Sequence, residues 1–168
     1  MQRKRTITWA DPEASKRDAV GSMSGLDYLR AIKAGRIDPP PAAKLVGYRI
    51  HAVAAGCAVF ELDPAEYHYN PFATVHGGVL STLLDTAMTA AVITTLPQGE
   101  TCSTVEIKVN FIRPVTAATG VLRCEARPVH VGRRLATVEG YLKDRAGKLV
   151  AHGISTCSIF RLKPLIRT

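Results

Sequence analysis

Two hydrophobic patterns divide the chain near residue 100. Before it lies one long apolar stretch, Val79 to Leu96, which follows Gly77-Gly78 and ends at Pro97-Gln98-Gly99. After it, apolar and polar residues alternate, most clearly in Ser103 to Arg113. A helix that is apolar on most sides must be covered on most sides, and a period of two is typical of half-buried strands. The pattern therefore predicts one buried helix followed by strands.

Shorter segments complete the predicted architecture. A helix is expected over 22–35, with Gly35 as its stop, and Asp38 to Pro41 breaks the chain. Short links between the strands favour antiparallel pairing, since a parallel crossover needs a dozen or more residues. We expect an α+β fold in which an antiparallel sheet of about six strands wraps around one long helix. The expected strands are 44–51, 57–62, 103–113, 121–127, 134–143 and 148–162.

Length and composition indicate a single domain. The chain has 168 residues, of which 46% are hydrophobic and 21% charged, and this excludes disordered and fibrous proteins. Residues 1–20 are polar and aperiodic and are expected to form a poorly ordered tail, which leaves 21–168 as the domain. Because Asp85, Ser81 and several threonines interrupt Val79 to Leu96, a buried helix is favoured over a membrane span. The charged N-terminus lacks a signal-peptide pattern, so we expect a cytoplasmic protein.

Charge and cysteine usage narrow the class of partner. The net charge is +8, and residues 101–168 carry 12 basic and 4 acidic side chains. A basic last third favours a polyanionic partner: nucleic acid, an anionic membrane or a phosphorylated small molecule. The four cysteines form no Cys-x-x-Cys pair and the histidines show no metal-ligand spacing, so we expect free thiols and no metal site.

Candidate chemistry concentrates on the long helix. The first N–H groups of a helix lack internal partners and carry partial positive charge, so the Gly77-Gly78 start could stabilise a carbonyl oxygen that gains negative charge. The alternative is that these glycines only permit tight packing. Asp85 lies two turns further along an apolar helix, where a carboxylate is either a base or a structural group held by neighbouring hydroxyls.

The combination of Asn70, His76-Gly77-Gly78 and Asp85 resembles the hotdog-fold acyl-CoA thioesterases of the phenylacetate-degradation (PaaI-like) branch. The resemblance extends over about residues 25–162 and includes VEIKVNFIRP from Val105 to Pro114. It implies a hotdog fold and hydrolysis of an acyl-CoA thioester to the free acid and CoA. Coenzyme A is then part of the substrate, and no separate cofactor is implied.

The resemblance also implies roles for individual residues. The Gly77 N–H and the Asn70 side chain would polarise the thioester carbonyl. Asp85 would act as general base on water, with a role as nucleophile as the alternative. A hydroxyl on the next strand would place the water: Thr104 by a gapless count from Pro114, with Ser103 as the alternative. His76 is expected to shape the loop, with a direct part in catalysis as the alternative. Gly78 is expected to contact the substrate.

Substrate binding would involve phosphate and apolar contacts. Arginines at strand ends match the phosphates of CoA, although a solvated basic face is the alternative: Arg113, Arg133 and Arg134. The acyl slot would be lined by apolar residues that could equally belong to the core: Phe72, Val75, Leu84 and Met88. The resemblance implies a homodimer or homotetramer in which Asn70 and Gly77 of one copy face Asp85 and Thr104 of the other.

Other functions fit the residues less well. A hotdog protein that binds acyl-CoA without turnover, as a sensor or carrier, is the main alternative. A nucleic-acid binder ranks last because aromatic residues make up 6% and no binding motif is present. The paired Asp/His helix motif of hotdog hydratases is not found. The sequence does not specify the acyl group, and it points to neither a membrane nor a nucleic acid as partner.

Overall fold

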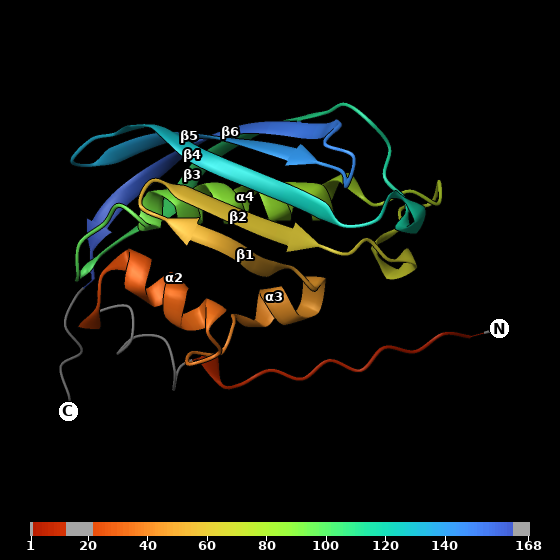
Figure 1. Cartoon of the computed structure of the whole chain (residues 1–168), viewed down its shortest axis with the longest axis horizontal. Helices are drawn as coiled ribbons and strands as arrows, with labels where there is room; N and C mark the ends of the chain where they lie inside the picture. The colour runs from red at the N-terminus through yellow and green to blue at the C-terminus, as the bar shows by residue number, and fades with distance from the viewer. Residues whose placement is uncertain (1, 13–21, 163–168) are drawn as a thin grey trace.

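A six-stranded antiparallel sheet curves around one helix (Figure 1). The computed structural model describes residues 2–12 and 22–162. Helix α4, Gly77–Ile93, lies on the concave face of a sheet with the order β1-β2-β4-β5-β6-β3. This confirms the predicted sheet around one long helix. The strands are β1 Arg49–Ala54, β2 Cys57–Leu62, β3 Glu100–Phe111, β4 Leu122–Val131, β5 Leu135–Lys143 and β6 Leu149–Arg161.

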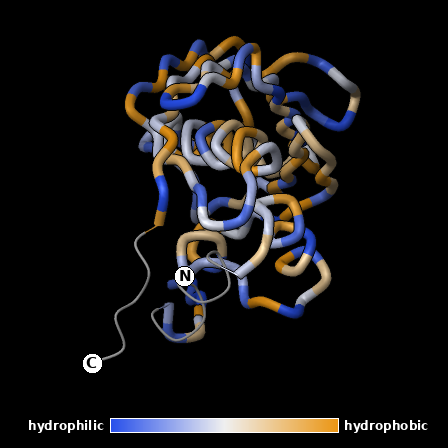
Figure 2. Tube along the Cα trace, turned by 90° about the vertical axis from the view of Figure 1, so that its left-hand side faces the viewer, coloured by the Kyte–Doolittle hydropathy of each residue, from blue (hydrophilic) through white to orange (hydrophobic). Residues whose placement is uncertain are grey.

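Helix α4 forms the centre of the core. Figure 2 shows its coil enclosed between the sheet and the N-terminal segments. Met88 is fully buried, and a Cβ atom on Gly140 or Gly153 would lie 3.0 or 3.1 Å from its side chain. Two glycines of the sheet thus let β5 and β6 approach the helix closely. Within the described ranges, no helix is long and apolar enough to cross a membrane.

The N-terminal half differs from the prediction at one element. The helix expected over 22–35 is α2, Gly25–Lys33, which the Ser24 hydroxyl caps, but residues 41–46 form a second helix, α3, Pro41–Val46. The strand expected over 44–51 was wrong: β1 begins only at Arg49. Proline is favoured in the first turn of a helix, and Gly47 ends α3 in a left-handed conformation with φ 92°. The apolar residues of this short helix resemble the start of a strand.

Strand β3 contains a bulge that breaks the predicted alternation. The pairing with β6 shifts between Thr104 and Glu106, and Val105 is 64% exposed instead of half-buried. Because a bulge inserts one residue, Thr104 before it and Ile107 after it both turn towards α4 despite their odd spacing. The bulge therefore presents Thr104 to the helix without withdrawing the rest of the strand from the core.

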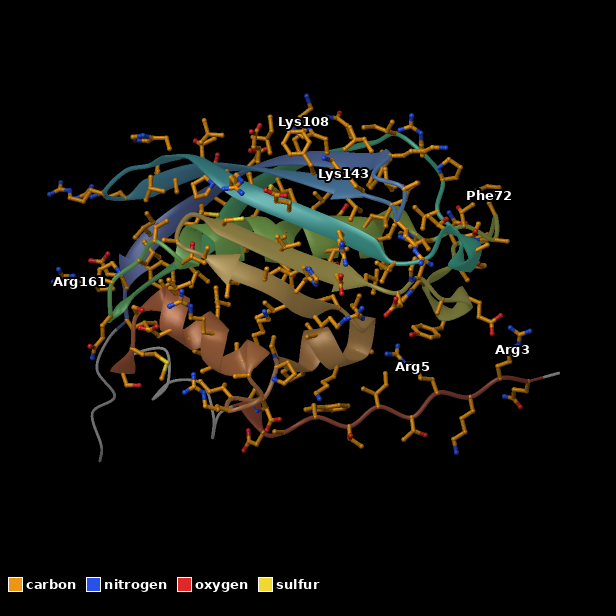
Figure 3. All side chains as sticks on the ribbon, viewed as in Figure 1. Arg3, Arg5, Phe72, Lys108, Lys143 and Arg161 are labelled. Carbon is orange, nitrogen blue, oxygen red and sulfur yellow. The ribbon has the colours of Figure 1, made fainter. Side chains whose placement is uncertain are left out.

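Part of the expected tail contacts the protein. The guanidinium of Arg5 donates to the carbonyl oxygens of Leu45 (2.7 Å) and Lys44 (3.2 Å) and lies 4.1 Å from the ring centroid of Tyr67. Figure 3 shows Arg3 and Arg5 on the extended segment that runs below α3. Arg5 thus attaches this segment to the C-terminal end of α3, while residues 1 and 13–20 of the expected tail lie outside the described residues.

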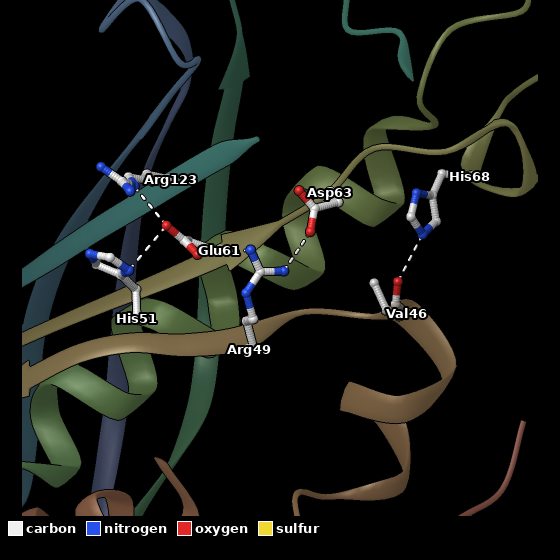
Figure 4. Close-up of polar contacts among 7 residues, drawn as sticks. All are labelled: Val46, Arg49, His51, Glu61, Asp63, His68 and Arg123. Atoms are coloured by element: carbon white, nitrogen blue, oxygen red, sulfur yellow. Dashed lines mark hydrogen bonds and ion pairs between the residues drawn. The ribbon is translucent and has the colours of Figure 1, made fainter. Parts of the chain in front are cut away.

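A charged cluster holds β1, β2 and β4 together on the outer face of the sheet (Figure 4). The carboxylate of Glu61, whose side chain is 8% exposed, accepts from Arg123 (2.7 Å) and Arg49 (2.9 Å), and His51 lies 3.0 Å away. Burial by itself would raise the pKa of Glu61. The Arg123 hydrogen bond and the nearby positive charges outweigh it and lower the pKa.

Glu61→Gln is expected to lower the free energy of unfolding at neutral pH by about 1–3 kcal/mol, because two charge-assisted hydrogen bonds lose their charge. Because the pKa of Glu61 is lower in the folded state, its ionisation stabilises the folded protein at pH values above the unfolded-state pKa of about 4.3. This contribution is lost as the pH falls through the folded-state pKa. The variant and wild type should therefore converge in acid. Urea unfolding at several pH values measures this, with the exposed Glu125→Gln as control. Equal loss in both variants would contradict a special role for Glu61.

Candidate active site

Asp85 is held by a chain of hydroxyl groups. The Thr104 hydroxyl donates to Asp85 Oδ1 at 2.7 Å, and the Thr89 and Thr104 hydroxyl oxygens are 3.0 Å apart. Since the single Thr104 proton is engaged by the carboxylate, Thr89 must donate to Thr104. The chain from Thr89 to Asp85 fixes the orientation of the half-buried carboxylate and leaves its second oxygen for another partner.

Sequence and sheet geometry explain this arrangement. Asp85 and Thr89 are four residues apart and share one face of α4. Thr104 faces them from β3 just before the bulge. Ser103 is exposed, and no hydrogen bond joins it to Asp85. Of the two predicted hydroxyls, the structure therefore brings Thr104 to the acid.

A cavity of about 630 Å³ opens beside Asp85. Its walls come from α2, the segment around α3, the edge strands β1 and β3, and α4. The lining is mainly apolar, and Asp85, Ser103 and Thr104 contribute polar groups. Sequence analysis missed this cavity, because its walls are brought together only by the fold. The apolar lining residues include Leu29, Ile32, Pro39, Pro40, Ala43, Ile50, Phe60, Ala90 and Ile93.

Three further ionisable groups lie near the acid. Burial raises the pKa of Tyr48; a hydrogen bond with Thr86 partly opposes this, and the charge of Asp85 adds to it. The thiols of Cys102 and Cys157 interact on the adjacent strands β3 and β6. Their hydrogen bond raises the pKa of Cys102 and lowers that of Cys157 to about 7. Both thiols are free and buried, as expected for small core residues.

A second hollow, of about 370 Å³, lies at the N-terminal end of α4. Its lining includes Asn70, Val75, Gly77, Phe111 and Arg113. A Cβ atom on Gly77 would lie 3.0 Å from the Phe111 ring, so glycine permits this tight packing. The two interpretations of the helix start, packing and an exposed amide, are therefore compatible.

The His76 side chain caps the N–H of Gly78 and leaves the N–H of Gly77 available. His76 Nδ1 accepts the Gly78 N–H at 2.8 Å, which shows how His76 shapes the loop. Among the described residues, no partner accepts a hydrogen bond from the Gly77 N–H. An unpaired N–H in the first turn of a helix suits an oxygen with developing negative charge.

Asn70 organises the loop before the helix. Its Oδ1 accepts the N–H groups of Phe72 (2.8 Å) and Thr74 (3.3 Å), and its Nδ2 donates to the Thr74 hydroxyl at 2.9 Å. An amide nitrogen has two donors, so one N–H of Asn70 is left for a ligand in the second hollow.

The acid and the amide do not meet within one chain. Eight residues separate Gly77 from Asp85 on α4, which corresponds to about 12 Å along the helix axis. They belong to different hollows. One carbonyl carbon cannot face both groups of the same protomer.

The predicted phosphate-binding arginines also separate. Arg113 lies beside Asn70 and Gly77, and its guanidinium donates to the Leu149 carbonyl oxygen. Arg133 and Arg134 lie in the β4–β5 turn at the other end of the sheet. The pairing places Phe111 beside Ala151 and Leu135 beside Ser158, seven residues apart on β6, or about 23 Å. A single chain therefore does not gather the three arginines at one phosphate.

The residues expected in the acyl slot lie elsewhere. Met88 and Leu84 are fully buried in the core against Gly140, and neither lines the cavity at Asp85. Phe72 is 85% exposed and projects at one end of the molecule (Figure 3). Val75 is buried at the second hollow. Val75, Leu84 and Met88 therefore belong to the core, which was the alternative interpretation.

Within the part of the chain that the structure describes, no three His, Cys, Asp or Glu side chains are grouped as metal ligands. The groups that the arrangement offers for chemistry are a carboxylate with hydroxyl partners and an unpaired amide.

Comparison with known proteins places this geometry among relatives. Residues 72–151 match the Thioesterase superfamily. A solved phenylacetic acid degradation-related protein of Ralstonia eutropha JMP134 is 34% identical, with a TM-score of 0.71, over 78% of this chain and 98% of that one. The 1,4-dihydroxy-2-naphthoyl-CoA hydrolase of Listeria monocytogenes is 29% identical over 68% of this chain and 89% of the relative. Human acyl-coenzyme A thioesterase 13 is 29% identical over 62% and 74%.

Proposed function

Because the chain belongs to the thioesterase superfamily and is a thioester hydrolase with a hotdog fold, we propose that it cleaves an acyl-CoA to the free acid and CoA with Asp85 as general base. The observation that carries this proposal is the Thr89–Thr104–Asp85 chain at the mouth of the cavity. It presents an oriented carboxylate where a thioester carbonyl can lie beside it. The similarity to named thioesterases favours turnover over an acyl-CoA-binding protein without activity.

The proposed reaction uses water as the nucleophile. Asp85 takes a proton from the water as its oxygen bonds to the carbonyl carbon, and Thr104 orients the carboxylate. The resulting oxyanion accepts hydrogen bonds from the Gly77 N–H and the free Asn70 N–H. The carbon–sulfur bond then breaks, the electron pair leaves with the sulfur of CoA, and the proton held by Asp85 passes to that thiolate.

The site is completed by a second copy of the chain. In the sheet that the structure describes, β3 pairs only with β6, and Val105, Phe111 and Ile112 are exposed along it. A 12-residue free edge is a ready surface for pairing. Thr104 lies near the middle of β3 and Phe111 at its C-terminal end, and Phe111 packs on Gly77. Antiparallel pairing of two β3 strands about a two-fold axis places Asp85 and Thr104 of one copy beside Gly77 and Asn70 of the other.

The proposed β3–β3 pairing also brings the three predicted phosphate-binding arginines closer together. Arg113 follows the end of β3 that carries Phe111, and the turn with Arg133 and Arg134 lies near the other end. Two antiparallel β3 strands bring Arg113 of one copy towards Arg133 and Arg134 of its partner. All three would then contact the phosphates of one CoA, which guanidinium groups suit.

The direct test is release of free CoA thiol from a panel of acyl-CoA thioesters by the purified full chain. We expect turnover of at least one acyl-CoA and formation of equimolar free acid. Binding of acyl-CoA without release of thiol across the panel would favour a carrier or sensor instead.

A further inference from the structure

We infer that the cavity beside Asp85 selects hydrocarbon acyl groups much larger than acetyl, over short acyl groups and over hydroxylated aromatic ones. This rests on the proposed function and names the substrate class of that site. Its main support is that the cavity that contains Asp85 and Thr104 is lined mainly by apolar residues. Asp85 and Thr104 lie where the thioester would react, while Ile32, Ile93 and Ala90 line the cavity.

The cavity is much larger than a small acyl group, which would contact little of its surface. About 630 Å³ lies in the range that holds drug-sized ligands. An acetyl group would leave most of this apolar surface without contacts. Each methylene moved from water to such a surface is expected to raise kcat/KM about fourfold until the space is filled.

Among the polar groups that line the cavity, two pairs of hydroxyls bond with each other, whereas Lys33 and Ser103 make no such bond with any residue that the structure describes. The Tyr48 hydroxyl bonds with Thr86, and Thr89 bonds with Thr104. The Arg49 guanidinium lies on the outer face of the sheet, where it pairs with Asp63 at 2.6 Å and with Glu61 at 2.9 Å. A hydroxyl on the acyl group that lies beside these engaged groups would therefore compete with existing bonds or remain unpaired, which costs about tenfold or more in kcat/KM. Tyr28, whose pKa burial raises, is the remaining hydroxyl on the α2 wall.

The wall opposite α4 comes from the N-terminal helices. Ile32 on α2 and Ala43 on α3 line the cavity, and Arg5 binds the carbonyl oxygens at the end of α3. The length of acyl group that fits is therefore set in part by residues that precede the segment matched by the superfamily, 72–151.

The first experiment compares kcat/KM for acetyl-, butyryl-, octanoyl-, benzoyl- and dihydroxybenzoyl-CoA. We expect octanoyl-CoA to exceed acetyl-CoA by about 100-fold or more, and benzoyl-CoA to exceed its dihydroxy derivative by about tenfold. A flat profile, a preference for acetyl-CoA or faster hydrolysis of the dihydroxy compound would overturn the inference.

The second experiment fills the cavity from two walls. Ala90→Leu on α4 and Ile32→Phe on α2 should each lower the ratio of octanoyl to butyryl kcat/KM by about tenfold, because the longer chain loses space. Leu45→Phe enlarges an apolar side chain that is 60% exposed outside the cavity and should leave the ratio unchanged. An unchanged ratio in both cavity variants, with thermal melting near wild type, would contradict the assignment.

Failure of the proposed reaction can be told apart from failure of this inference. Equilibrium binding of octanoyl-CoA and acetyl-CoA to Asp85→Asn requires no turnover. Tighter binding of octanoyl-CoA supports the cavity assignment even if the reaction differs, and equal binding overturns it.

Discussion

Asp85→Asn is expected to lower kcat by about 10²–10⁴-fold with little change in KM or in thermal stability. Asparagine keeps the shape of the side chain, and its Oδ1 can still accept the Thr104 hydroxyl that lies 2.7 Å from Asp85 Oδ1. What it loses is the ability to take a proton from water. The Thr89–Thr104 bond lies outside the substituted group and should persist.

The measurement is thiol release under saturating octanoyl-CoA, with a thermal melt of each protein. Glu125→Gln, on the exposed outer face of β4, is the matched control and should hydrolyse at the wild-type rate. An Asp85→Asn protein as fast as wild type would remove Asp85 from the reaction. A slow variant that melts far below wild type would instead assign the carboxylate a structural role.

Two inactive variants should restore activity when they share a dimer. Asn70→Asp keeps the acceptor that binds the Phe72 and Thr74 amides but replaces the free donor by a negatively charged oxygen. Loss of one oxyanion donor costs about 10²–10³-fold. If each site takes Asp85 from one copy and Asn70 from the other, a mixed dimer with Asp85→Asn has one intact site.

An equal mixture that exchanges subunits should therefore recover about a quarter of the wild-type activity, since half of the dimers are mixed and half of their sites are intact. Differently tagged subunits, co-expressed and purified through both tags, isolate the mixed dimer directly. Mixed dimers that stay as inactive as their parents would place Asp85 and Asn70 in the same protomer's site, or in no common site.

The parts of the fold that depend on local pattern could be predicted from the sequence. The apolar stretch after Gly77 gave helix α4, and the alternation in residues 122–126 corresponds to buried Leu122, Cys124 and Ala126 in β4. Helix α3 was missed because its six residues, Pro41–Val46, are too few for a hydrophobic pattern to distinguish a helix from a strand. The bulge at Val105 was missed because register depends on the partner strand, β6.

In the candidate site, too, some residues could be predicted from the sequence and others depend on how distant segments come together. Asp85, Gly77 and Thr104 could be named from the sequence because the resemblance assigns their roles to fixed positions, and the structure brings Thr104 to Asp85. The acyl cavity depends on α2 and β1 closing over α4, and no local pattern shows that Ile32 and Ala90 share a wall. Met88 was a candidate for the slot or for the core, and its side chain packs in the core against Gly140 and Gly153.

Helix α4 carries an exposed amide at its first residue and a carboxylate two turns later. In the proposed dimer each copy of this helix serves both reaction centres, giving an oxyanion donor to one and a base to the other. A tilt or axial shift of one rigid rod then changes geometry at two places at once. A ligand that tilts or shifts this helix at one centre would therefore also act on the other, which predicts cooperativity between the paired sites.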